Sequence, residues 1–162
     1  MTRIAGIRRI AETEQIMAET AAQQPPGRPH RHPATVGDVM RPPLTTVDQN
    51  DHVAAAAYLM RPGGATALVV LDGQDTSRPL GIITEADIVH TVADGRDVNE
   101  VRIRDVMTTG PTVVTADTGI PEAAETMTSG HFRHLPVVGD GGLTGIVDIR
   151  DVCRALLDMS VG

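Results

Sequence analysis

Two matching segments of the chain carry the side chains best suited to recognising a ligand. The first, Gly81–Asp87, reads GIITEAD, and the second, Gly145–Asp151, reads GIVDIRD. In each, an apolar run ends on a polar residue, and a carboxylate follows three residues later. This is the pattern of a capping box, in which side chains satisfy the free N–H groups of a first helical turn. The same residues could cradle a nucleotide, because a helix N-terminus attracts phosphate and a carboxylate accepts hydrogen bonds from a ribose diol, although the local residues alone favour the cap.

The two segments are corresponding parts of an internal repeat. An offset of 67 residues pairs Val36–Met40 with Ile103–Met107, and after a length difference in the Asp72–Arg78 loop the offset becomes 64. Each copy predicts the order β-α-β-β-α. A unit of this size buries too little apolar surface to be stable alone. We therefore expect an α+β fold in which two β-α-β-β-α repeats pack sheet to sheet with pseudo-two-fold symmetry.

The repeat predicts a matching set of strands and helices in each copy. In the first copy we expect strands at 45–47, 67–71 and 80–84, and helices at 36–40, from Asn50 or Asp51 to Met60, and at 85–93. In the second copy we expect strands at 113–114, 135–138 and 143–147, and helices at 120–127 and 149–159.

Residues 1–33 lie outside the repeat. Their apolar residues have helical spacing over about 3–22, which predicts an amphipathic helix, and the proline-rich stretch at 23–33 predicts a linker. The chain is therefore expected to divide into an N-terminal helix and linker at 1–33, a first repeat at 34–94 and a second repeat at 95–162.

Composition argues against several classes of protein. The chain has 162 residues, 41% of them apolar and 1% aromatic, and a formal net charge of -7. So few aromatic residues and so acidic a body argue against binding of nucleic acid. One cysteine, Cys153, allows no intramolecular disulfide and no zinc site of CxxC type, and no apolar run approaches the ~20 residues of a membrane span. We expect a cytoplasmic protein with no membrane segment, and Cys153 buried on the apolar face of the last helix.

Five short motifs give the chain a family resemblance. They are Val39-Met40, Leu44–Val47, Gly81–Asp87, His134–Val138 and Gly145–Asp151. With these motifs in order, about residues 35–159 resemble a tandem pair of CBS domains, the cystathionine β-synthase repeat, also called a Bateman module. The resemblance implies a non-catalytic regulatory module, which binds an adenosine compound (AMP, ADP, ATP or S-adenosylmethionine) between its repeats and signals to a protein partner. It also implies a homodimer, and no cofactor beyond the regulatory nucleotide.

The resemblance further implies which residues hold the ligand. Asp87 would accept from the ribose hydroxyls, Thr84 would contact ribose and phosphate, the backbone at 45–47 would hold the adenine, and basic residues at 131–134 would meet the phosphate. The residues expected in this main site are Thr45, Thr46, Val47, Thr84, Asp87, His131, Arg133 and His134. The corresponding residues of a weaker second site are Thr112, Val113, Val114, Asp148 and Asp151.

The two expected sites differ in charge. The first has Thr84 opposite Arg133. In the second, Asp148 stands where the family prefers Ser or Thr, and it faces the uncharged Thr66. A carboxylate repels a nearby phosphate, whereas the planar fork of an arginine binds it well. We expect the first site to bind a nucleotide and the second to stay empty or to take an uncharged nucleoside.

Other functions stay open on the residues alone. The chain could be a ligand-free module for dimerisation or protein interaction or, with less support, a small enzyme or a DNA-binding regulator. No Ser/His/Asp or Cys/His set has a spacing that favours catalysis. His131 and His134 could form a metal pair, but residues three apart on a strand point to opposite faces, so we expect no metal site. The sequence does not identify the regulated partner.

Overall fold

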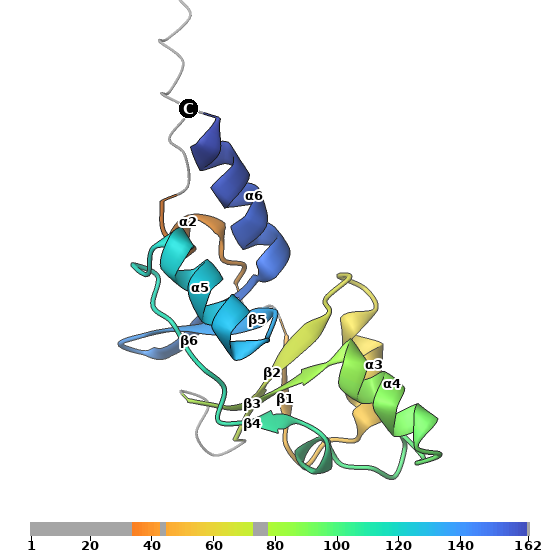
Figure 1. Cartoon of the computed structure of the whole chain (residues 1–162). Helices are drawn as coiled ribbons and strands as arrows, with labels where there is room; N and C mark the ends of the chain where they lie inside the picture. The colour runs from red at the N-terminus through yellow and green to blue at the C-terminus, as the bar shows by residue number, and fades with distance from the viewer. Residues whose placement is uncertain (1–33, 43–44, 73–77, 162) are drawn as a thin grey trace, which may run out of the picture. The chain divides into compact units, whose positions relative to one another are not determined.

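Each copy of the repeat forms a small sheet with helices beside it (Figure 1). The computed structural model describes residues 34–42, 45–72 and 78–161, so the helix expected at 3–22 and the linker at 23–33 lie outside the described residues. The first copy contains α2 (Val36–Val39), β1 (Thr46–Asp48), α3 (Val53–Met60), β2 (Ala67–Leu71), β3 (Pro79–Thr84) and α4 (Glu85–Ala93). The second contains η1 (Ile103–Asp105), β4 (Thr108–Thr109), α5 (Ile120–Gly130), β5 (His134–Gly139), β6 (Gly142–Asp148) and α6 (Ile149–Ser160).

The two copies have the same strand order. One sheet runs β1-β2-β3-β4, with β1 parallel to β2 and the other neighbours antiparallel. In the other sheet, β5 and β6 form an antiparallel pair that single-residue bridges extend on both sides. Val114 pairs in parallel with Val137 of β5, and Arg41 pairs with Ile146 of β6. The α+β fold of two repeats predicted from the sequence is confirmed.

The elements with the strongest local signals have the predicted bounds. β2 reads ALVVL and is buried along its whole length, as expected of a short apolar run inside a sheet. α4 begins directly after β3, because Thr84 has extended backbone and its hydroxyl accepts a hydrogen bond from the first helical turn.

Two local predictions are wrong. α3 is capped at His52 rather than at Asn50 or Asp51. The carboxylate of Asp51 instead accepts from the Asp48 backbone N–H at 3.1 Å, and Asp48 accepts from the Asn50 backbone N–H at 2.8 Å, so these side chains close a turn before the helix. The strand expected at 113–114 is reduced to one bridging residue, and the chain pairs earlier, as β4, with β3.

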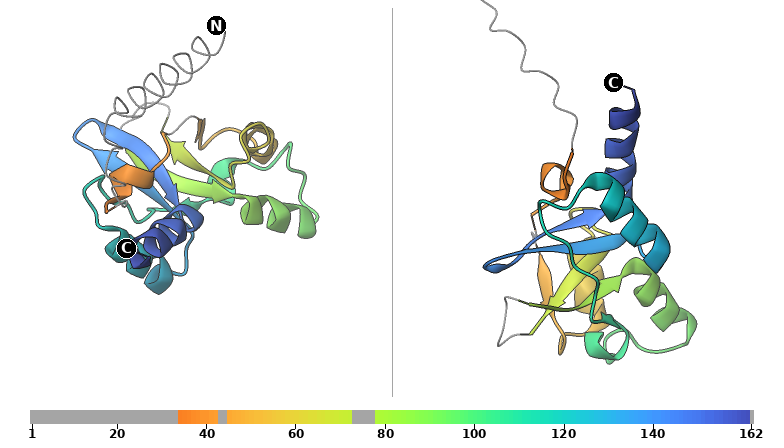
Figure 2. Two further views of the ribbon diagram at one scale, coloured as in Figure 1. Left: turned by 90° about the horizontal axis from the view of Figure 1, so that it is seen from above. Right: turned by 60° about the vertical axis from the view of Figure 1, so that its left-hand side comes forward.

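The two copies exchange short segments at their starts. Val36 of α2 opens the first copy, but it is fully buried in the core of the second copy with Leu135, and α2 packs next to α6 (Figure 2). Ile103 of η1 opens the second copy, but it is fully buried in the core of the first copy with Ile83. β4 and Arg41 follow the same exchange, because each pairs with the other copy's sheet. Neither core is complete without the other copy.

The exchange explains the glycine that opens each of the two motifs. A Cβ at Gly81 would lie 2.7 Å from both the Met107 Sδ and the Thr108 carbonyl oxygen. A Cβ at Gly145 would lie 2.9 Å from the carbonyl oxygen of Arg41, whose backbone is hydrogen-bonded to β6. The crossing segment therefore leaves no room for a side chain at either position.

Candidate functional site

A large cleft lies between the two copies, beside the N-terminus of α4. Its volume is about 590 Å³, within the range of small-molecule sites. The first copy contributes Thr66 and residues 82, 84–86 and 89 to its walls. The second copy contributes residues 108, 110–112 and 131–134. Both copies are needed to form the cleft.

Thr84 and Asp87 form the capping box of α4. The backbone N–H and the hydroxyl of Thr84 each donate to Oδ2 of Asp87 at 2.7 Å, and the Asp87 backbone N–H donates to the Thr84 Oγ1 at 3.3 Å. Thr84 lines the cleft, whereas the half-buried Asp87 lies one hydrogen bond behind it. The cap fixes both side chains at the positive end of the helix dipole, where an anion is favoured.

The opposite wall is positioned by the end of α5. His131 adopts the left-handed conformation, with φ 56°, and its N–H bonds to carbonyl groups of the last helical turn. This geometry ends the helix and carries residues 131–134 along the cleft. His131 and Arg133 are exposed, whereas the side chain of His134 is only 10% exposed.

The charges on the cleft wall are few. Among its described lining residues, Arg133 is the only arginine and Glu85 the only carboxylate. Both are exposed. An anionic ligand would therefore meet one attractive guanidinium, and one repulsive carboxylate beside Thr84.

The structure groups the expected site residues differently from the sequence. Thr112, assigned to the second site, lines the large cleft with Thr84. Residues 45–47 do not line it: Thr46 and Val47 pair with β2, and Val47 is buried in the first core. The segment exchange is the reason, since the stretch that precedes each copy's first strand reaches the other copy's sheet.

Val113 and Val114, which were also assigned to the second site, lie apart from Asp148 as well. Val113 is exposed and lines a separate hollow, whose walls include Pro79 and Asp140. Val114 forms the bridge to β5. The second site predicted from the sequence is therefore not gathered in one place.

A much smaller hollow lies at the N-terminus of α6, in the position that matches the large cleft. Its volume is about 60 Å³. Its walls consist of Arg41, residues 64–67, His134, Ile146, Asp148 and Arg150. His134 lines both the hollow and the cleft. We refer to these two spaces as the first cleft and the second cleft.

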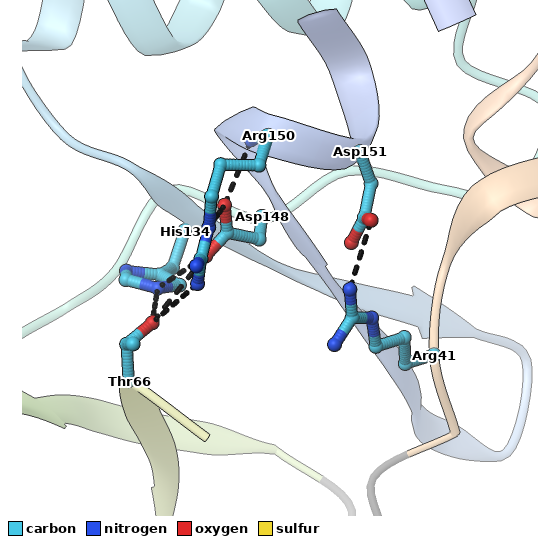
Figure 3. A network of polar contacts seen from close by, with 6 residues as sticks. All are labelled: Arg41, Thr66, His134, Asp148, Arg150 and Asp151. Carbon is cyan, nitrogen blue, oxygen red and sulfur yellow. Dashed lines mark hydrogen bonds and ion pairs between the residues drawn. The ribbon is translucent and has the colours of Figure 1, made fainter. Parts of the chain in front are cut away.

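Asp148 is the centre of a polar network in the second cleft (Figure 3). Its Oδ1 accepts from the backbone N–H of Arg150 at 2.7 Å and from Nε of Arg150 at 3.1 Å. Its Oδ2 accepts from Nη2 of Arg150 at 3.1 Å and from the Thr66 hydroxyl at 3.3 Å. Nε2 of His134 lies 3.1 Å from that Oδ2 and 2.8 Å from the Thr66 Oγ1. Thr66 belongs to the first copy, so the network joins the two copies.

The network sets the protonation of its two titratable members. Burial raises the pKa of Asp148, but hydrogen bonds from Arg150 and the nearby positive charge outweigh it and lower that pKa to about 2. Burial lowers the pKa of His134, and the charge of Asp148 opposes this only in part. At neutral pH the carboxylate is ionised and the imidazole is neutral. Because a carboxylate can only accept, the imidazole carries its proton on Nε2.

Asp151 is held differently from its counterpart Asp87. Its Oδ1 forms an ion pair with Nη2 of Arg41 at 2.9 Å. Its Oδ2 is buried and accepts no hydrogen bond from the described residues. α6 is capped by Asp148, which accepts from the backbone N–H of Arg150, and the capping box of α4 has no equivalent there.

Sequence reasoning missed three of these charged residues. Glu85 and Arg150 lie inside the two motifs, and a residue in the first turn of a helix can reach back toward the cap, so the motifs held a signal for both. Arg41 corresponds to Thr108 by the 67-residue offset. Its contact with Asp151 depends on the segment exchange, which the sequence does not reveal.

Three further expectations concern Cys153, metal binding and membrane segments. Cys153 is exposed rather than buried, because the buried face of α6 runs through Val152 and Ala155. Within the described residues, no group of three or more His, Cys, Asp or Glu side chains could hold a metal ion. No helix in the described part of the chain has the length and apolar character needed to cross a membrane.

A known family matches both copies of the repeat. The family profile of the CBS domain matches residues 36–94 and 103–158. The chain belongs to the CBS-domain family. The two matched stretches make it a tandem CBS pair.

Relatives of this CBS pair include proteins of similar size. The chain is 40% identical over 125 residues to an uncharacterised 17.7 kDa protein of Acidianus ambivalens, a match that covers 76% of this chain and 74% of that one. A solved protein with CBS domains from Burkholderia ambifaria is 32% identical with a TM-score of 0.66, covering 74% of this chain and 85% of that chain. The solved complex of CBSX2 with AMP is 30% identical with a TM-score of 0.63, covering 79% and 99%.

Proposed function

We propose that this CBS pair is a non-catalytic regulatory module that binds one adenosine nucleotide per chain in the first cleft and signals to a protein partner. The observation that carries the proposal is the position of Thr84, at the N-terminus of α4, on the same cleft as the exposed Arg133. A helix N-terminus and a guanidinium both bind phosphate. CBSX2, which has a similar fold, is solved with AMP, and this supports the ligand class.

Each part of the nucleotide has a proposed place. The phosphate lies between Arg133 and the N-terminus of α4. The ribose lies against Thr84, and its hydroxyls reach past Thr84 to donate to Asp87, which lies behind the cleft wall. The adenine lies along residues 110–112, which line the cleft, rather than along residues 45–47, which do not. His134 contributes shape rather than charge, because its Nε2 is engaged by Thr66 and Asp148.

Titration calorimetry with AMP and with adenosine tests these roles. An affinity in the micromolar range, about -8 kcal/mol, is expected for AMP. Arg133→Ala should weaken AMP by about 10-fold or more, as expected for loss of a charge-assisted contact, and should leave adenosine nearly unchanged. Asp87→Ala should weaken both ligands, because both contain the ribose. Arg154→Ala removes an exposed arginine of α6 that lines neither cleft and is the control.

Two results would overturn the proposal. If the wild-type protein binds no adenosine compound at millimolar concentration, the nucleotide site is rejected and the ligand-free interaction module becomes the better reading. If Arg133→Ala weakens AMP and adenosine equally, the phosphate is not at Arg133.

Exposed apolar side chains on α4 and α6 support self-association as part of the proposal. Val92 is 60% exposed and Leu157 is 67% exposed, and burying such side chains in a second copy is favourable. We expect a homodimer near twice 17.1 kDa. Light scattering of Val92→Asp and Leu157→Asp should show dissociation, whereas Val113→Asp, an exposed position on neither helix, should not. A monomeric wild type would reject the dimer.

A further inference from the structure

We infer that the second cleft is a latent site for a nucleoside phosphate, and that Asp148 closes it by binding Arg150 as an internal substitute for the ligand. The ligand class rests on the proposed function of the first cleft. The closure itself rests on the geometry around Asp148.

The two clefts have matched residues with one decisive difference. By the 64-residue offset, Asp148 corresponds to Thr84 and Asp151 corresponds to Asp87. In α4 the cap residue Thr84 carries a hydroxyl, and the carboxylate of Asp87 three residues later completes the capping box. In α6 the cap is itself a carboxylate, which bonds to Arg150 two residues later.

This difference leaves Asp151 without its expected partner. Asp87 accepts the backbone N–H and the hydroxyl of Thr84, whereas the Oδ2 of Asp151 is buried and accepts no hydrogen bond from the described residues. A buried carboxylate oxygen without a donor is costly. Asp151 does not line the second cleft as it stands, so a ligand hydroxyl would supply the missing donor only once the cleft is open.

The basic side chains of the second cleft are present but occupied. Two arginines, Arg41 and Arg150, line it, compared with one, Arg133, among the described residues of the first cleft. Arg150 is bound to both oxygens of Asp148, and Arg41 is bound to Asp151. These contacts are of the kind that a phosphate would make. The cleft is correspondingly reduced to about 60 Å³, against about 590 Å³ for the first cleft.

The closure is permanent at ordinary pH. The hydrogen bonds from Arg150 keep the pKa of Asp148 at about 2 despite its burial, so protonation does not release the arginine. The buried charge would also repel an incoming phosphate. Opening the cleft therefore requires removal of the carboxylate.

The test is Asp148→Thr, which places a threonine in the second cleft at the position that Thr84 occupies in the first. Threonine is a good N-cap, and Asp151 stands three residues later to complete a capping box. Calorimetric titration with AMP should give one site per chain in the wild type and two in the variant. When Arg133→Ala has weakened the first site, Asp148→Thr should still bind one AMP. Asp158→Thr makes the same chemical change at an exposed position of α6 and should leave the number of sites at one.

Asp148→Asn is a second variant, because it keeps the size of the side chain and an acceptor for the Arg150 N–H while removing the charge. It should show the second AMP site with weaker affinity than Asp148→Thr. The inference is overturned if either variant, folded as judged by its thermal transition, binds no more AMP than the wild type, or if the wild type already binds two. If the wild type binds none and Asp148→Thr binds one, the proposed function of the first cleft fails and the latent site stands.

Discussion

His134 and Asp148 face each other across β5 and β6, and Nε2 of the imidazole lies 3.1 Å from Oδ2 of the carboxylate. The same imidazole lines the first cleft, whereas the carboxylate lines only the second. The contact between these two side chains therefore lies at the boundary between the clefts, and the charge of Asp148 faces only the second. It also gives the protein two titrations that can be measured.

The first prediction concerns the imidazole. Burial is expected to hold the pKa of His134 in the folded protein below 6.5, and the charge of Asp148 opposes that effect. Asp148→Asn should therefore lower the pKa of His134 further. NMR titration of the histidine rings, with the urea-unfolded chain as reference, measures both. A folded-state pKa above the unfolded value, or one raised in Asp148→Asn, would contradict the network described here.

The second prediction concerns stability in acid. The pKa of Asp148 is about 2 in the folded protein, against an ordinary value of 3.8. A depressed carboxylate pKa means that its stabilisation is fully present above pH 3.8 and is lost as pH falls toward 2. Asp148 should contribute about 1–2 kcal/mol in this way after solvent screening. Urea unfolding at several pH values should show a shallower loss of stability in Asp148→Asn, and parallel curves would exclude this contribution.

The third prediction concerns Glu85 and depends on the proposed function. Its carboxylate lies on the wall of the first cleft beside Thr84 and should disfavour ligands with more negative charge. Glu85→Gln should improve ATP binding several-fold more than AMP binding. Glu122→Gln, in the first turn of α5 and away from the clefts, is the matched control. Equal gains for both nucleotides would show that Glu85 does not select by charge.

The fourth prediction concerns the glycine of the first motif. Gly81→Ala would place a Cβ within 2.7 Å of the Thr108 carbonyl oxygen, so β4 must shift, and the loss of stability should be about 1–3 kcal/mol. Gly63→Ala meets nothing within 4 Å and should change stability little. Thermal unfolding of the two variants compares them directly. Equal melting temperatures would mean that the crossing segment yields without cost.

The fifth prediction concerns the exchanged core residue. Ile103→Ala removes a fully buried side chain from the core of the first copy and should cost about 2–5 kcal/mol. Val113→Ala, at an exposed position in the same connecting region, should cost far less. Denaturant unfolding measures both. A small loss for Ile103→Ala would contradict its placement in that core.

The sequence was sufficient for features that depend on near neighbours. The ALVVL run of β2, the turn from β3 into α4 and the cap at Thr84 are all local. The internal repeat predicted the corresponding strands and helix of the second copy, but the capping box that it also predicted there is absent from α6. The repeat did not predict which core contains Val36 or Ile103, because an apolar residue predicts burial but not the residues that it packs against.

The sequence did not predict the contact between His134 and Asp148, for a different reason. Counting back along the hairpin from the pair Gly139 and Gly142 would place His134 opposite Val147. The register shifts between Val137 and Val138, and this places His134 opposite Asp148 instead. Such a bulge changes every pairing beyond it. The assignment of His134 to a ligand phosphate followed instead from the family resemblance, which does not show that its Nε2 lies beside Asp148 and Thr66.

The exchange of opening segments also bears on the order in which the chain is made. Translation delivers the first copy up to residue 94 before Val101 and Ile103, which belong to its core, exist. The second copy meets no such delay, because Val36 has already been synthesised when its own core residues emerge. The first copy must therefore leave the ribosome with part of its core open, and a truncated product that ends before Ile103 should be degraded rather than fold.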